Sequence, residues 1–136
     1  MSFSIDGKTA IVTGAANGIG LAIARHFADQ GANVMFADMD ENSLVKELGD
    51  MPEEGNIRYF SGDLREKLTL ANLLSGTIDA FDSVDILVNA SRQVLPTSPL
   101  DADDDTVSVL LQQNLLTSLR LSQLVARRMI KQAEGR

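Results

Sequence analysis

A cluster of glycines near the N-terminus is the part of this sequence with the clearest chemical meaning. The apolar stretch 9–12 runs directly into the segment 13–20, TGAANGIG. Gly14 permits a tight turn, Gly18 leaves room for a pyrophosphate, and Gly20 lets a following helix pack close to the strand. The free N–H groups at the start of that helix then face the anion. The predicted contacts to a dinucleotide are therefore Gly14, Asn17, Gly18, Ile19 and Gly20.

An acidic residue stands where the next strand should end. Asp38 closes the stretch 33–38, NVMFAD. A carboxylate there can accept hydrogen bonds from both hydroxyls of an adenosine ribose, and it would repel the 2′-phosphate of NADP. Neither Asn17 nor Met39 carries a positive charge that could hold such a phosphate. We therefore expect NAD in preference to NADP; the alternative is a solvated carboxylate that merely closes a strand.

The elements that must position these residues alternate along the chain. Apolar runs predict strands over 8–13, 33–38, 57–61 and 84–89. Helical patterns predict helices over 19–30, 41–48 with Asp40 as cap, 66–81 interrupted by Gly76, and about 101–133. The first helix carries Ile19, Ile23 and Phe27 on one stripe. This alternation predicts an α/β fold, a doubly wound parallel sheet of about four strands and four helices with right-handed crossovers.

The last of these helices is apolar on more than one side, which predicts burial on more than one side. Its acidic start, 101–105, reads as a cap and first turn rather than a cation site. One face carries Val107, Leu110, Leu111, Asn114, Leu115, Leu121, Val125 and Met129, and a second carries Val109, Leu116, Leu119, Leu124 and Ile130. The alternative is a core helix with a few exposed leucines.

Composition narrows the classes of function. The 136 residues carry a net charge of −7, which argues against binding to nucleic acid or to an anionic membrane surface. Cysteine is absent and His26 is the single histidine, so no metal site is predicted. The sequence has no apolar run of membrane-spanning length, and its start lacks a signal pattern. A cytoplasmic location is the expectation.

Taken together, the motifs resemble the N-terminal half of a classical short-chain dehydrogenase/reductase over essentially the whole chain. Thr13-Gly14-x-x-x-Gly18-x-Gly20 is similar to the family's cofactor motif, and Gly62-Asp63-Leu64 to its Asp-hydrophobic pair. The segment 85–90, DILVNA, resembles the strand that leads into Asn-Asn-Ala-Gly. The triplet 113–115, QNL, lies where the family places a structural and catalytic Asn.

The resemblance implies a Rossmann-type fold and hydride transfer between nicotinamide and an alcohol or ketone. It places Asp63 and Leu64 at the adenine, and Asn89 and Ala90 at the middle of the cofactor. Asn114 would be the one remaining member of the catalytic set. The family also implies that the last helix helps to build a subunit interface.

Two departures from the family pattern stand out. The segment 89–92 reads NASR, with one Asn missing and Arg92 where Gly would fall. Arg92 would contact a phosphate or remain a solvated loop residue. The catalytic Ser and Tyr-x-x-x-Lys have no counterpart, since the single tyrosine is Tyr59 and position 63 is Asp. We therefore expect 1–136 to form one NAD(P)-binding domain, truncated before the family's fifth strand and without the catalytic half.

Two functions from different classes remain open. In the first, the chain is the NAD-binding piece of a longer oxidoreductase and is inactive alone. In the second, it is a complete small module that binds a cofactor or a partner without catalysis. In both, the missing fifth strand would leave the edge of the fourth strand unpaired. We expect a homo-oligomer that forms through this edge or through the last helix.

Overall fold

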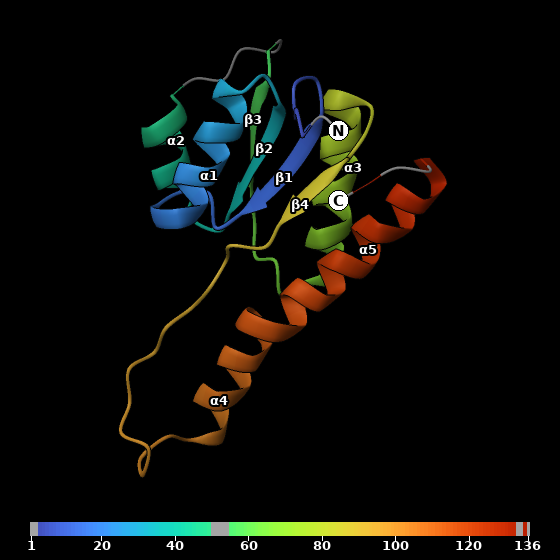
Figure 1. The fold of residues 1–136 in the computed structure, drawn as a ribbon. Coiled ribbons are helices and arrows are strands. Elements are labelled where there is room, and N and C mark those ends of the chain that lie inside the picture. The colour runs from blue at the N-terminus through green and yellow to red at the C-terminus, as the bar shows by residue number, and fades with distance from the viewer. Residues whose placement is uncertain (1–2, 50–54, 133–134, 136) are drawn as a thin grey trace.

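The computed structural model describes residues 3–49, 55–132 and 135. Its sheet has four parallel strands in the order β3-β2-β1-β4 (Figure 1). Because β2 and β3 lie on one side of β1 and β4 on the other, the winding reverses at β1. The prediction of a doubly wound parallel sheet is confirmed. The strands are β1 (Thr9–Thr13), β2 (Asn33–Asp38), β3 (Ile57–Ser61) and β4 (Ile86–Val88).

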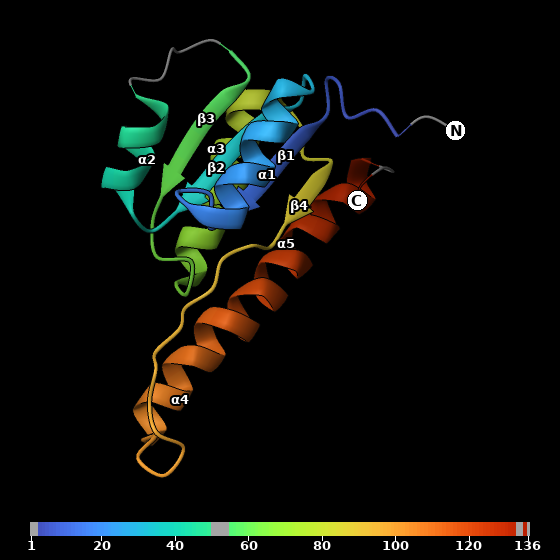
Figure 2. The same ribbon diagram turned by 60° about the vertical axis from the view of Figure 1, so that its left-hand side comes forward.

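Helices cover both faces of the sheet, α1 and α2 on one and α3 and α5 on the other (Figures 1 and 2). None of the helices in the described part of the chain has the length and apolar character needed to cross a bilayer. The helical elements are α1 (Gly18–Asp29), α2 (Glu41–Leu48), α3 (Lys67–Phe81), α4 (Asp104–Leu111), the π-helical turn η1 (Gln112–Leu116) and α5 (Thr117–Gln132).

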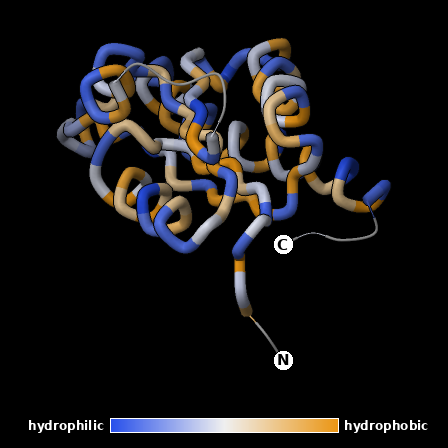
Figure 3. Tube along the Cα trace, turned by 90° about the horizontal axis from the view of Figure 1, so that it is seen from above, coloured by the Kyte–Doolittle hydropathy of each residue, from blue (hydrophilic) through white to orange (hydrophobic). Residues whose placement is uncertain are grey.

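The fully buried strand β1 divides the core into two layers. Successive side chains of a strand point to opposite faces, so Ile11 packs with Leu73 and Leu121 under α3 and α5. Val12 faces the other way and joins the cluster under α1 and α2 that contains Phe36. Figure 3 shows apolar stretches running through the middle of the molecule between the helices.

The most deeply buried residues of helix α1 are small, while Ile23 and Phe27 of the predicted stripe are partly buried against the same core cluster. The buried positions of α1 are Gly20, Ala24 and Ala28, whereas Ile19 is 73% exposed. Small side chains let the helix backbone approach the sheet closely. Ile19, at the start of the stripe, lies outside the core and lines the cavity described below.

Helix α3 runs unbroken through Gly76, where the sequence predicts an interruption. A glycine inside a helix costs only about 0.5–1 kcal/mol relative to alanine. Burial of Leu70 and Leu73 in the core outweighs that cost. The helix ends at Asp82, whose backbone is left-handed with φ of 67°.

The predicted helix over 101–133 is three elements, α4, η1 and α5. It begins at Asp104, because the Asp103 carboxylate accepts a hydrogen bond from the Thr106 N–H and caps it. This hydrogen bond lowers the pKa of Asp103. The acidic segment is thus a cap and first turn, as predicted. At the end of η1 the hydroxyl of Thr117 donates to the Gln112 carbonyl at 2.9 Å, and this added donor stabilises the wider turn.

A stripe of apolar side chains on α4, η1 and α5 has no cover within the described part of the chain. Its members recur every fourth residue and are about half exposed: Val107 44%, Leu111 51%, Leu115 56% and Leu119 50%. Helix α4 extends beyond the sheet (Figure 2). Only one side of α5, with Leu121 and Val125, enters the core. The prediction that the last helix is buried on more than one side is therefore wrong for a single copy of this chain.

Strand β4 lies at the edge of the sheet and is shorter than the predicted 84–89. Ahead of it, the side-chain amide of Gln132 bonds both the N–H and the carbonyl of Val84, at 3.2 and 2.8 Å. At Val84, the Gln132 amide forms the two hydrogen bonds that the backbone of a neighbouring strand would otherwise form. The predicted open edge is therefore partly covered by the chain itself, and Ile86–Val88 pairs with β1 alone among the described residues.

Candidate cofactor-binding site

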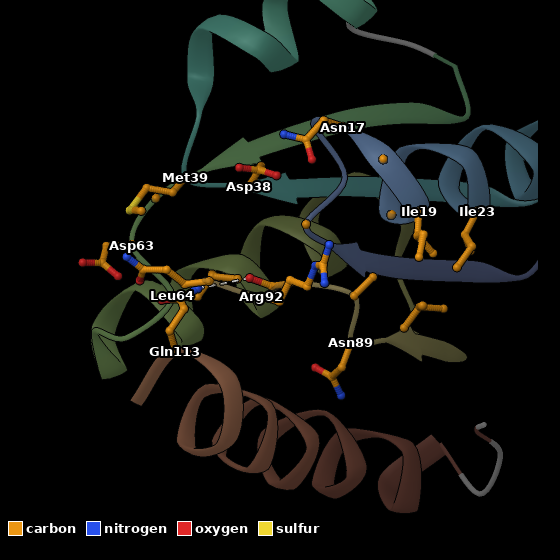
Figure 4. Close-up of a pocket in the computed structure, with 18 residues that line it drawn as sticks. Asn17, Ile19, Ile23, Asp38, Met39, Asp63, Leu64, Asn89, Arg92 and Gln113 are labelled. Carbon is orange, nitrogen blue, oxygen red and sulfur yellow. Dashed lines mark hydrogen bonds between the residues drawn. The ribbon is translucent and has the colours of Figure 1, made fainter. Parts of the chain in front are cut away.

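A cavity of about 560 Å³ opens at the carboxyl ends of the four strands (Figure 4). This is where the winding of the sheet reverses, the usual position of a ligand in an open α/β fold. All ten residues predicted to contact the cofactor line it, although their roles stay predictions. They are Gly14, Asn17, Gly18, Ile19, Gly20, Asp38, Asp63, Leu64, Asn89 and Ala90.

The three glycines after β1 have three different geometries. Gly14 has φ of 63°, and a Cβ there would lie 2.6 Å from the Ala90 carbonyl oxygen. A Cβ on Gly20 would overlap the Gly14 carbonyl, so this glycine lets α1 start directly against the turn. Gly18 has φ of 56° and open space at its Cβ position. This space leaves the backbone accessible from the cavity, as phosphate binding requires.

The start of α1 suits an anion. Asn17 is its N-cap residue but makes no side-chain hydrogen bond to the helix, and the first turn has no acidic residue. The positive end of the helix dipole and its free N–H groups therefore face the cavity without a competing carboxylate from the same turn.

Asp38 is held at the end of β2 by two backbone donors. Its Oδ2 accepts from the N–H of Ala16 at 3.0 Å, and its Oδ1 accepts from the N–H of Asp40 at 2.9 Å. These bonds tie the carboxylate to the glycine turn and hold it at the wall of the cavity (Figure 4). Each oxygen keeps a lone pair for a further donor.

Asp63 forms an ion pair that the sequence patterns did not predict. Arg65 donates from Nε to Oδ1 at 3.0 Å and from Nη2 to Oδ2 at 2.8 Å, and its backbone N–H donates as well. These hydrogen bonds lower the pKa of Asp63, and Asp63 in turn raises the pKa of Arg65. Leu64 beside it is almost fully buried.

The altered segment after β4 is clamped at both ends. The Thr13 hydroxyl accepts from the N–H groups of Ala90 and Ser91, each at 3.2 Å. The Asn114 side chain bonds the N–H and the carbonyl of Gln93 at 2.7 and 2.8 Å. Arg92, between these clamps, lines the cavity. Its exposed side chain has no ion pair among the described residues, so contact with a phosphate stays a prediction.

The side chains of two predicted site residues, both asparagines, form hydrogen bonds to other parts of the chain. Asn89 lines the cavity, but its side chain donates to the Ser122 hydroxyl of α5 at 3.0 Å (Figure 4). Asn114 does not line the cavity, because both of its polar atoms bond Gln93. The predicted catalytic residue is therefore not brought to the cofactor cavity, and its catalytic role stays a prediction.

Sequence reasoning missed several lining residues, of which Gln113 is the most informative. It is 8% exposed, and its Nε2 donates to the Ser91 hydroxyl at 3.1 Å. The signal in the sequence that could have identified Gln113 was a polar residue within a mostly apolar helix. The other missed lining residues are Ile23, Met39, Gly62, Val88, Ser91 and Gln93.

Comparisons with known proteins agree with this geometry. The sequence matches the short chain dehydrogenase family over residues 8–136. The chain therefore belongs to that family, which comprises oxidoreductases dependent on a nicotinamide cofactor.

Its relatives are similar at a modest level. An uncharacterized oxidoreductase of Thermotoga maritima is 30% identical over 96% of this chain and 52% of its own length. D-threitol dehydrogenase of Mycolicibacterium smegmatis is 31% identical over 98% and 52%. NAD-dependent glycerol dehydrogenase of Listeria innocua is 28% identical over 98% and 52%. The chain thus spans about half the length of these relatives.

Solved structures show the same fold. The crystal structure of gox2181 superimposes with a TM-score of 0.87 at 31% identity, over 96% of this chain and 51% of that one. A short chain dehydrogenase from Bacillus anthracis gives a TM-score of 0.88 at 22% identity, over 97% and 54%. The second similarity supports the fold alone.

Proposed function

We propose that this chain is the NAD-binding portion of a short-chain dehydrogenase/reductase that transfers hydride between nicotinamide and an alcohol or ketone. The observation that carries the proposal is the cavity, which joins the glycine turn, the start of α1 and the carboxylate of Asp38. The close contacts at Gly14 and Gly20 form a backbone cradle that no larger residue allows.

Each part of the cavity has a proposed partner in the dinucleotide. The glycine turn and the start of α1 bind the pyrophosphate, and Asp38 accepts from the ribose hydroxyls. Asp63 and Leu64 border the adenine, and Asn89 and Ala90 the middle of the cofactor. When bound, the nicotinamide ring supplies the hydride donor or acceptor. The residues of this chain bind and orient it.

Titration calorimetry with NAD⁺ tests the proposal. Saturable binding with one site per chain is the expected result. A purified, folded chain that releases no heat with either NAD⁺ or NADH, even at millimolar concentrations, would contradict the proposal.

Gly20→Ala should damage the site. The added methyl overlaps the Gly14 carbonyl, so the turn must shift. Overpacking of this kind costs about 1–3 kcal/mol of stability, and a displaced turn should weaken NAD⁺ binding at least tenfold.

Gly76→Ala is the matched control for this variant. Its Cβ meets open space within α3, so it should raise stability by up to about 1 kcal/mol and leave binding unchanged. Thermal melting and calorimetry measure both quantities. Unchanged NAD⁺ affinity in Gly20→Ala would show that the turn does not hold the cofactor.

A second candidate is a small module that binds a cofactor or partner without catalysis. The position of the single tyrosine favours it: Tyr59 lies in β3 and packs with the core cluster under α1 and α2. The coding sequence beyond codon 136 and the intact mass of the natural protein separate the two candidates. Downstream codons for Ser and Tyr-x-x-x-Lys favour the enzyme.

The half-exposed stripe on α4, η1 and α5 supports a homo-oligomer. We expect Leu111→Glu combined with Leu119→Glu to convert the protein to a monomer, because buried charges oppose an apolar contact. Light scattering across a concentration series measures the state. Ala71→Glu combined with Ser75→Glu, two exposed positions on α3, is the control with the same added charge. An unmodified chain that stays monomeric at high concentration would disprove this assembly.

A further inference from the structure

Gln113 is a buried polar side chain whose hydrogen bonding is incomplete. Its Nε2 donates to Ser91 Oγ, but its Oε1 is buried without a hydrogen-bond partner among the described residues. Buried carbonyl oxygens normally accept at least one hydrogen bond, so an orphaned one indicates a partner that arrives from outside. Because Gln113 lines the cavity, a ligand bound there can supply that partner.

The structure holds this amide firmly in place. One end of the amide is tied to Ser91, and the Ser91 N–H is itself bound by Thr13 of β1. The π-turn lies beside the loop after β3, where the Thr117 hydroxyl oxygen is 3.5 Å from the Leu64 carbonyl oxygen. The oxygen of Gln113 therefore has a fixed position at the Leu64 side of the cavity (Figure 4).

The neighbouring residues define what kind of donor fits. Leu64 offers an apolar surface and Asp63 a carboxylate. That carboxylate already accepts four hydrogen bonds from Arg65, three from the guanidinium and one from the backbone N–H. An apolar surface beside an acceptor suits a flat heterocycle that carries an amino group. Of these two acceptors, the Asp63 carboxylate is paired with a cation and Gln113 Oε1 is not.

We propose that Gln113 Oε1 accepts a hydrogen bond from the 6-amino group of adenine, so that Gln113 selects the nucleobase of the cofactor. This inference rests on the proposed function, because it places the adenosine half of the dinucleotide between Leu64 and the π-turn. Ser91 is then a positioning residue that orients the amide.

Nicotinamide hypoxanthine dinucleotide tests the proposal, since it differs from NAD⁺ on this edge of the base. Its 6-oxo group accepts where the amino group donates, so it faces Gln113 Oε1 with a second acceptor. The unmodified chain should bind NAD⁺ about five- to tenfold more tightly than the hypoxanthine analogue, the range expected for one hydrogen bond.

The variant Gln113→Met keeps the length of the side chain and removes both polar atoms. It should lower the preference for NAD⁺ to about twofold or less, because the remaining discrimination comes from Asp63. Gln112→Met, an exposed position on the same turn, should behave like the unmodified chain. Calorimetry gives the affinities, and thermal melting shows whether each variant is folded.

The outcomes separate this inference from the proposed function. Equal affinity of the unmodified chain for both dinucleotides overturns the role of Gln113 without any variant. An unchanged preference in a folded Gln113→Met protein overturns it as well and leaves NAD binding intact. Failure of the unmodified chain to bind either dinucleotide overturns both proposals.

Discussion

NAD⁺ is expected to bind this protein about thirtyfold more tightly than NADP⁺, which corresponds to about 2 kcal/mol. The carboxylate of Asp38 is fixed by the N–H groups of Ala16 and Asp40, so it cannot turn away from a 2′-phosphate without losing both bonds. The two cations nearest the cavity stand differently toward this repulsion. Arg65 is paired with Asp63, and Arg92 follows β4, beyond β1 from Asp38.

Calorimetry with both cofactors measures the preference, and Asp38→Asn and Asp38→Ala should narrow it. The Asn variant loses the negative charge but keeps one oxygen that can accept from the backbone N–H groups. It therefore distinguishes the effect of the charge from the effect of the hydrogen bonds that support the turn. Glu41→Ala, an equal change of charge at an exposed position in the first turn of α2, should leave the preference unchanged. Equal affinity of the unmodified chain for NAD⁺ and NADP⁺ would refute the role of Asp38.

A polypeptide of these 136 residues should bind NAD(H) but turn over no alcohol or ketone. General acid–base assistance contributes about a hundred- to ten-thousandfold to a rate, and positioning of the substrate adds a further large factor. Tyr59 packs against the core cluster under α1 and α2. Asn114 does not titrate, and its amide is taken up by Gln93.

A screen of secondary alcohols and ketones, followed by the absorbance of NADH, tests this prediction. The intact mass must first show a homogeneous 136-residue chain. Steady turnover that disappears in Asp38→Ala would contradict the expectation. Such a result would assign the proton transfer to a residue within this chain, with Tyr59 of a neighbouring copy as the first candidate.

The sequence by itself determined the central sheet and the glycine turn that follows its first strand. The bounds of β2 and β3 agree with the predicted 33–38 and 57–61. The short apolar runs and the glycines act locally, because a run's hydrophobicity selects a strand and a glycine's backbone freedom selects a turn. Asp38 was predictable for the same reason, since its place follows from the end of the strand that carries it.

Only the tertiary structure decided what depends on contacts between distant segments. The close approach of α1 to the sheet selected Gly20, Ala24 and Ala28 as its buried face.

The π-turn is the clearest case of a tertiary effect. Its hydrogen bonds to Ser91, Gln93 and Leu64 cross more than twenty residues of chain, so no local periodicity contains them. They turn Asn114 toward the loop and Gln113 into the cavity. The sequence pattern had predicted a role for Asn114, but it is the adjacent Gln113 that lines the cavity. The reason is that side-chain direction in a helix depends on the register of each turn.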